Sequence, residues 1–254
     1  MHQELESPID IHAQWNAPKH IVACTTTRLN GFSQAPFDAF NLGLHVDDCV
    51  DDVLKNRAAL KTRLGLTQEP IWLEQTHSNT CIVVEETQNR IADAAITRLS
   101  HVPLVVMTAD CVPIVLCDER GQEIAAIHAG WRGLLHGIIQ NTVNTLISKP
   151  QHLLAWIGPA ICKHCFNIGP EVKEHFVSLY GDIVSTAFDK NQQQHRGNLP
   201  LIAEIILKQC GINAIHQSNL CTFEDKNRFY SYRRTAKTGR MVTLICSFQE
   251  ASIP

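Results

Sequence analysis

The sequence predicts a single-domain α+β sandwich, with mixed sheets flanked by helices, that spans residues 1–254. Three observations lead to this prediction. Segments with strand character outnumber helical segments, and they arrive in clusters and not in strict alternation with helices. No Pro/Gly/Ser-rich linker or internal repeat divides the chain. The glycine fingerprints of P-loop and dinucleotide-binding folds are absent from the sequence, which argues against a doubly wound nucleotide-binding sheet.

The first half of the chain is predicted to be mostly strand. Residues 20–27, "HIVACTTT", alternate in polarity and are β-branched, which is typical of a strand, and the Gly/Pro/Asn-rich residues 28–43 predict an irregular loop. Residues 47–65 predict an amphipathic helix with an acidic first turn and Gly65 after its end. Further strands are predicted at 70–75, 80–85, 93–97, 103–108, 112–118 and 123–129.

The second half mixes helices with strands. Apolar residues at helical spacing predict one helix from Gly130 to about residue 148, and two more at 169–181 and 198–211. The polar stretch 189–199, "DKNQQQHRGNL", predicts a loop. The remaining strands are predicted at 152–158, 213–218 and 240–248.

Composition excludes several classes of protein. Hydrophobic residues make up 44% and charged residues 19% of the chain, which is ordinary for a globular protein. A formal charge of −3 favours neither nucleic acid nor an anionic membrane as a partner. No apolar run approaches the ~20 residues of a membrane span, and the acidic start lacks the order of a secretory signal, so we expect a cytoplasmic protein.

Three side chains at the ends of predicted strands could form a metal site. His77 follows residues 70–75, Cys111 precedes 112–118, and His128 lies near the end of 123–129. Strand ends on one edge of a sheet converge, and two imidazoles with a thiolate suit Zn²⁺ while leaving a fourth position open. Spacing alone leaves the alternative, in which Cys111 is a small core residue and both histidines are hydrogen-bonded at strand ends.

Three other motifs are candidates for a functional role. "CKHC" (162–165) has CxxC spacing, but no second pair follows at a zinc-finger interval, which favours a loop with two incidental thiols. "HAGWRG" (128–133) and Arg28 offer either an anion site, with Arg132 as a cation, or a tight turn with solvated arginines. The basic and aromatic residues 228–240 predict a solvated loop or a contact at the edge of a substrate.

An ordered set of motifs then identifies a resemblance. The set comprises "TTTR", "FNLGLHVDD", "WLEQTHS", "ADAAIT", "TADCVPIVL", "AAIHAGWRG", "IGPAIC" and, late in the chain, "FYSYRR" with "TGR". Together these closely resemble the polyphenol-oxidase/laccase-domain purine nucleoside phosphorylase family from about residue 20 to residue 246. The resemblance favours the metal site over its alternative.

The resemblance implies a zinc ion held by His77, Cys111 and His128. It implies phosphorolysis of adenosine, inosine, guanosine or methylthioadenosine, and deamination of adenosine, with purine nucleosides and phosphate as the small-molecule partners. Asp93 and Asp110 lie in its motifs as catalytic candidates, one of which could orient a ligand imidazole. The positions that the resemblance implies bind phosphate or nucleoside are Arg28, Asn41 and Arg132.

The chain departs from the family pattern at two places. The first loop reads Arg28-Leu29-Asn30-Gly31 where relatives often have Arg-x-Gly-Gly, although Asn tolerates a left-handed turn better than most residues. "CKHC" differs from many relatives before Cys165, so Cys162 has no role implied by the family.

Other functions remain as alternatives. The family's older name suggests a copper-dependent oxidase of phenols, although none of the thirteen histidines forms the His-x-His pair expected of clustered copper ligands. A hydrolase that edits cell-wall peptide precursors is a second alternative. A zinc-stapled binding module is a third, and it fits an open coordination position poorly.

Overall fold

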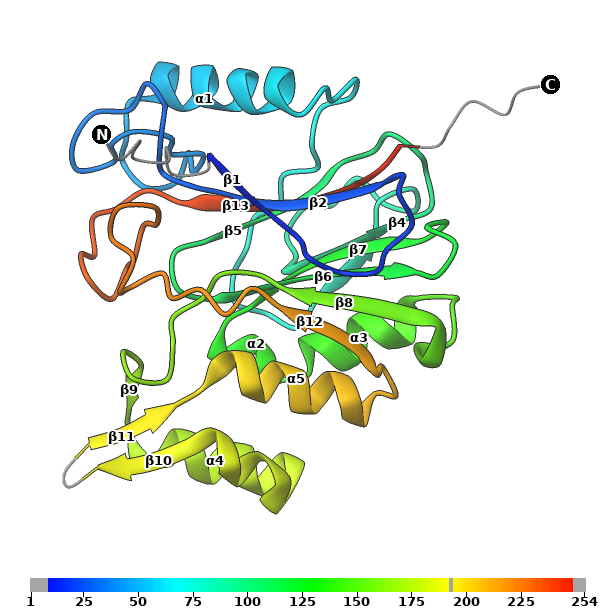
Figure 1. Cartoon of the computed structure of the whole chain (residues 1–254), viewed down its shortest axis with the longest axis vertical. Coiled ribbons are helices and arrows are strands. Elements are labelled where there is room, and N and C mark those ends of the chain that lie inside the picture. The colour runs from blue at the N-terminus through cyan, green and yellow to red at the C-terminus, as the bar shows by residue number, and fades with distance from the viewer. Residues whose placement is uncertain (1–8, 192–193, 249–254) are drawn as a thin grey trace, which may run out of the picture.

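The computed structural model describes residues 9–191 and 194–248, and the predicted α+β architecture of mixed sheets flanked by helices is confirmed (Figure 1). Sheet I is antiparallel and contains, in spatial order, β1 (Asp10–His12), β2 (Ile21–Thr26), β13 (Met241–Ser247) and β5 (Leu104–Thr108). Sheet II is mixed and contains β12 (Ala214–Gln217), β8 (Leu153–Ile157), β6 (Val112–Asp118), β7 (Ile124–Ala129), β4 (Ala94–Thr97) and β3 (Cys81–Val83).

Sheet II is buried on both faces. Along β6, Val115 and Cys117 pack toward sheet I, whereas Ile114 and Leu116 pack toward the helices on the other side. Because successive side chains of a strand point to opposite faces, a strand covered on both sides reads as an unbroken apolar run, as "VPIVLC" does. The core around sheet II therefore lies in two layers, one on each side of this sheet.

Helices cover the outer faces of both sheets. α1 (Val50–Arg63) packs on sheet I, with Leu60 against apolar side chains of β5 and β13. α2 (Trp131–Leu135), α3 (Ile138–Thr145) and α5 (Leu199–Gln209) pack on the free face of sheet II (Figure 1). α4 (Pro170–Tyr180) follows β9 (Asn167–Ile168), and short 3₁₀ turns lie at Pro150–His152 and Asp182–Ala187.

The helix predicted from Gly130 to about residue 148 is wrong as a single element. It is divided into α2 and α3 at Gly137, whose φ of 87° is a left-handed value that interrupts helical hydrogen bonding. The break lets α3 turn and lay Ile138, Ile139 and Val143 on sheet II. Apolar spacing continues across the break, which is why the periodicity does not reveal it.

Two other predicted elements are corrected. Residues 70–75 form isolated bridges at Ile71 and Glu74 and no strand. The predicted polar loop 189–199 is largely a hairpin of β10 (Phe188–Asn191) and β11 (Gln194–Gly197), and β11 also pairs with β9. A strand at the surface forms through backbone pairing and does not require an apolar pattern. The polar composition of residues 189–199 therefore does not exclude strands there. Among the described helices, none combines the length and apolar character needed to cross a membrane.

Candidate metal centre and its cavity

Neighbouring strands of sheet II bring Cys111 and His128 to one edge. β6 and β7 are antiparallel, with Val112 paired to Ala129 and Pro113 paired to His128. Cys111 immediately precedes β6, so it comes out at the same edge as His128. His77 reaches this edge from the loop before β3, with a left-handed φ of 59°.

The three predicted ligands meet in space. Their candidate donor atoms all lie within 4.8 Å of one another, with 3.8 Å between Cys111 Sγ and His77 Nε2. The imidazole rings of His77 and His128 are 4.8 Å apart and meet edge to face. Two ring nitrogens and one sulfur are a donor set that suits Zn²⁺, and His77 is exposed while His128 is buried.

Gly130 leaves the room that this arrangement needs. A Cβ atom at this position would lie 2.8 Å from Cδ2 of His77 and 3.2 Å from Sγ of Cys111. Any side chain there would therefore push two of the three donors away from their common point. The glycine between Ala129 and the first turn of α2 is thus part of the construction of the centre.

Asp93 fixes the orientation of His128. Its carboxylate is fully buried and accepts a hydrogen bond of 2.8 Å from His128 Nδ1, which leaves Nε2 of that ring for a metal. The same carboxylate accepts hydrogen bonds from the backbone N–H groups of Thr76, His77 and Ser78 and from the Ser78 hydroxyl. Asp93 therefore positions two of the candidate ligands, His77 and His128.

The electrostatics of the centre favour a thiolate. Burial raises the pKa of the Cys111 thiol. The charge of His128 and hydrogen bonds to His128 and His77 lower it by more than burial raises it, so the pKa lies below the ordinary value. Burial likewise opposes ionisation of Asp93, yet hydrogen bonds from His128 and Ser78 bring its pKa to about 2. Anionic sulfur and carboxylate are the forms that bind and orient a cation.

The Asp110 carboxylate connects the chain before β6 to two later segments through hydrogen bonds. Its φ is 106°, and its Oδ1 accepts a hydrogen bond of 2.7 Å from the Thr222 hydroxyl. Its Oδ2 accepts hydrogen bonds from the Ser231 hydroxyl and from the backbone N–H of Arg233. Both oxygens are therefore occupied in holding residues 222 and 231–233 beside Cys111.

A cavity of about 690 Å³ opens beside the three candidate ligands. Its lining includes three arginines, Arg132, Arg233 and Arg240, together with several apolar side chains. Arg233 donates to the Asn167 carbonyl and lies over the Phe166 ring at 4.9 Å. The side chains of His45, Ile161 and Val172 also line the cavity. A recess of this size with convergent polar groups is typical of a small-molecule site.

The structure places Arg28 and Asn41 outside the lining of this cavity. Arg28 forms an ion pair of 3.0 Å with Asp38 in a separate hollow. Asn41 is fully buried, and its amide is engaged with Gly43, Asp48 and the backbone N–H of Arg240. Asn41 therefore contacts the backbone of a residue that lines the cavity, Arg240.

Sequence reasoning missed Arg233, Arg240 and His45 as cavity residues. The two arginines belong to the basic, aromatic stretch 228–240, which the sequence favours as a solvated loop or a substrate-edge contact. The interleaving of aromatic and basic residues there was the available signal. His45 lies in the "FNLGLHVDD" motif, and burial and the charge of Arg240 lower its pKa.

Comparison with known proteins adds to this geometry. The family model described as multi-copper polyphenol oxidoreductase laccase matches residues 22–247. A protein of Haemophilus influenzae named purine nucleoside phosphorylase is 44% identical over 92% of this chain and 98% of its own length. A protein of the same name from Pseudomonas aeruginosa is 41% identical over 91% of this chain and 95% of its own length.

Solved structures agree with the sequence matches. A Neisseria meningitidis protein superposes with a TM-score of 0.91 at 35% identity, covering 95% of this chain and all of its own. A Geobacillus stearothermophilus protein gives a TM-score of 0.84 at 27% identity, covering 94% and 100%. The chain therefore belongs to the multi-copper polyphenol oxidoreductase laccase family, in which relatives of this similarity are named purine nucleoside phosphorylases.

Proposed function

We propose that this protein is a zinc-dependent purine nucleoside phosphorylase that also deaminates adenosine. The observation that carries the proposal is the meeting of His77, Cys111 and His128 beside a cavity whose lining includes three arginines. The names of its relatives in two bacteria support the phosphorylase part of the proposal. Adenosine, inosine, guanosine and methylthioadenosine are the proposed nucleoside substrates.

Phosphorolysis requires cations and an apolar surface in one recess. A phosphate oxygen attacks C1′ of the ribose, the bond from C1′ to the purine nitrogen breaks, and that nitrogen leaves with the electron pair and takes up a proton. We assign the phosphate to the guanidinium groups of Arg132, Arg233 and Arg240, which neutralise its charge and position it for attack. The apolar side chains of Ile161, Phe166 and Val172 are assigned to the purine.

The metal is assigned to the two imidazoles and the thiolate. A bound zinc ion would supply Lewis-acid chemistry and lower the pKa of water, which the deamination of adenosine at C6 requires. His128 is held by Asp93 so that its Nε2 faces the other two donors, and Gly130 keeps that space clear. Asp110 keeps Arg233 near the recess through the backbone of that residue.

The oxidase alternative is favoured only by the family's description. A multicopper oxidase needs clustered imidazoles, whereas the donor group at this cavity contains two histidines among the described residues. We also propose a cytoplasmic location. All ten cysteines are free, which suits a reducing compartment.

The test is an assay of purified protein on adenosine, with and without phosphate. We expect adenine and ribose-1-phosphate only when phosphate is present, and inosine in both conditions. Chromatographic separation of the products measures each reaction, and Cys111→Ser protein purified in parallel controls for a contaminating phosphorylase. Equal turnover by that variant would contradict the proposal, as would oxygen uptake on a phenol by copper-loaded protein without any nucleoside cleavage.

A further inference from the structure

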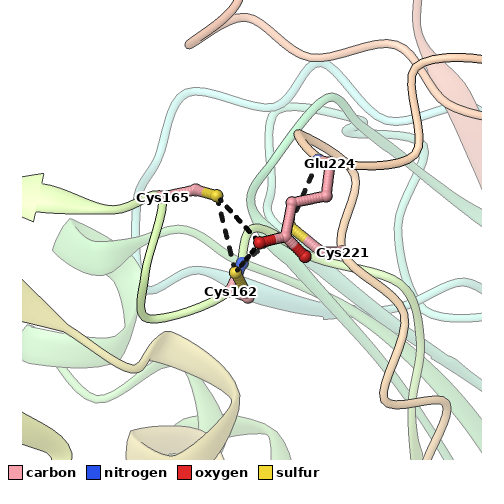
Figure 2. A group of neighbouring side chains, drawn as sticks. All are labelled: Cys162, Cys165, Cys221 and Glu224. Carbon is pink, nitrogen blue, oxygen red and sulfur yellow. Dashed lines mark hydrogen bonds between the residues drawn. The ribbon is translucent and has the colours of Figure 1, made fainter.

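A second group of possible metal ligands lies beyond the end of β8. It consists of Cys162, Cys165, Cys221 and Glu224, whose side chains gather around one point in Figure 2. Their candidate donor atoms all lie within 4.8 Å of one another. "CKHC" therefore supplies only two of the four residues. The other two, Cys221 and Glu224, lie at least 56 positions after Cys165 in the sequence.

Two similar turns build the cluster. Within each turn the donors are three residues apart, and the backbone folds back through Cys165 N–H to Cys162 O and through Asp225 N–H to Cys221 O, both at 3.1 Å. The turns are joined by backbone hydrogen bonds of Ala160 with Leu220 and Thr222. The pairing of backbones thus brings the two halves together independently of any side-chain contact.

The separations fit the edges of a tetrahedron around one ion. Sγ of Cys162 is 3.6 Å from Sγ of Cys165, and each sulfur is 3.6 Å from Oε1 of Glu224. Donors bonded tetrahedrally to zinc, with bonds of about 2.3 Å to sulfur and 2.0–2.2 Å to oxygen, lie roughly 3.5–3.8 Å apart. A disulfide would require about 2.05 Å, and these cysteines are free.

The surroundings of Cys221 suit a thiolate. Its sulfur accepts hydrogen bonds from the backbone N–H groups of Cys162 at 3.3 Å and Glu224 at 3.5 Å. Such N–H donors stabilise negative charge on sulfur, and a hydrogen bond of this kind orients a ligand toward its metal. Each N–H comes from a residue that is itself in the cluster.

We propose that Cys162, Cys165, Cys221 and Glu224 form a second, structural zinc site. Three thiolates select a soft or borderline cation, and a fourth protein donor closes the coordination sphere. A closed sphere leaves no position for substrate, in contrast to the centre formed by His77, Cys111 and His128. The site is independent of the proposed nucleoside chemistry.

The proposed ion would brace one wall of the large cavity. Ile161, which lines the cavity, donates its backbone N–H to the Asp110 carbonyl at 3.0 Å. Thr222, next to Cys221, donates its hydroxyl to the Asp110 carboxylate. Asp110 in turn precedes Cys111. Clamping the two turns therefore fixes the segments that connect the cluster to the other metal centre.

Zinc content measures the proposal directly. After zinc loading and gel filtration, we expect about two zinc ions per wild-type chain and about one in Cys165→Ser, as for the loss of one complete site. Cys111→Ser should also retain about one ion, now at the second cluster. Cys49→Ser, which removes an exposed cysteine outside both groups, should keep the wild-type content. Unchanged zinc in Cys165→Ser would overturn the proposal.

A measurement on the wild-type chain covers the case in which Cys165→Ser does not fold. Zinc-loaded and EDTA-treated protein are alkylated, and each cysteine is followed by peptide mass spectrometry. We expect zinc to protect Cys162, Cys165 and Cys221 together, while Cys49 reacts in both samples. Protection that is insensitive to zinc, or a Cys162–Cys165 disulfide released only by reductant, would refute the site. Neither readout depends on nucleoside turnover.

Discussion

Replacement of Cys111 by serine is expected to lower phosphate-dependent nucleoside cleavage by more than about 100-fold while the fold is retained. Loss of an outer partner of a metal ligand already costs 10–100-fold, and this change removes a ligand itself. Serine differs from cysteine by one atom, and Cys111 is not fully buried. The structural cost should therefore be small, whereas His128→Ala would also remove one hydrogen bond from the buried Asp93 carboxylate.

Three readouts check this expectation. Turnover and zinc affinity should both fall, and the midpoint of thermal unfolding should stay close to that of Cys49→Ser, which serves as the matched cysteine control. A variant that unfolds would favour a zinc-stapled binding module over a catalyst. A variant that is folded, has lost the zinc ion of this centre and still cleaves nucleosides at the wild-type rate would contradict the catalytic role of this centre.

Asp93→Ala is expected to lower the free energy of unfolding by more than about 3 kcal/mol and to weaken zinc binding at least 10-fold. The substitution leaves the backbone N–H groups of Thr76, His77 and Ser78 without their acceptor and frees the His128 ring to rotate. Urea unfolding gives the first quantity, and competition with a chelator gives the second.

Asp118→Ala is the matched control. It is a buried aspartate at the opposite end of β6, and its carboxylate also accepts backbone hydrogen bonds, from Arg120, Gln122 and Glu123. It should lose stability without losing zinc affinity. If the two variants weakened zinc binding equally, the proposed role of Asp93 in positioning the metal ligands would be contradicted.

The depressed pKa of Asp93 also fixes the sign of a pH effect. Burial opposes its ionisation, but His128 and Ser78 bring the pKa to about 2, below the ordinary value near 3.9. The unfolded state therefore binds the proton more readily, and the stabilisation is fully present above the ordinary value. It is lost as pH falls from about 4 to about 2, and Asp93→Ala should flatten the stability profile over that interval.

The sequence predicts the centre of the fold well where one local pattern decides the structure. Residues 112–118 and 123–129 are apolar runs because sheet II is buried on both faces, and their ends place Cys111 and His128 at one edge. The hairpin at 188–197 and the break at Gly137 were missed. Backbone pairing and a single left-handed residue, respectively, decide those two features.

The candidate sites depend on contacts that the linear sequence does not display. Arg233 is held beside the cavity by the Asp110 carboxylate, a partner 123 residues away. Cys221 joins "CKHC" because its strand-like backbone pairs with Ala160. Neither contact has a local pattern, so cavity arginines and the second half of the cysteine cluster emerge only with the tertiary structure.

The central claim is that His77, Cys111 and His128 hold one catalytic zinc ion. Anomalous diffraction from zinc-loaded crystals, recorded above and below the zinc absorption edge, locates that ion directly. We predict a peak within about 2.0–2.3 Å of both imidazoles and the Cys111 sulfur, facing the cavity. A crystal of protein that is active on nucleosides but lacks zinc between these three side chains would contradict the account.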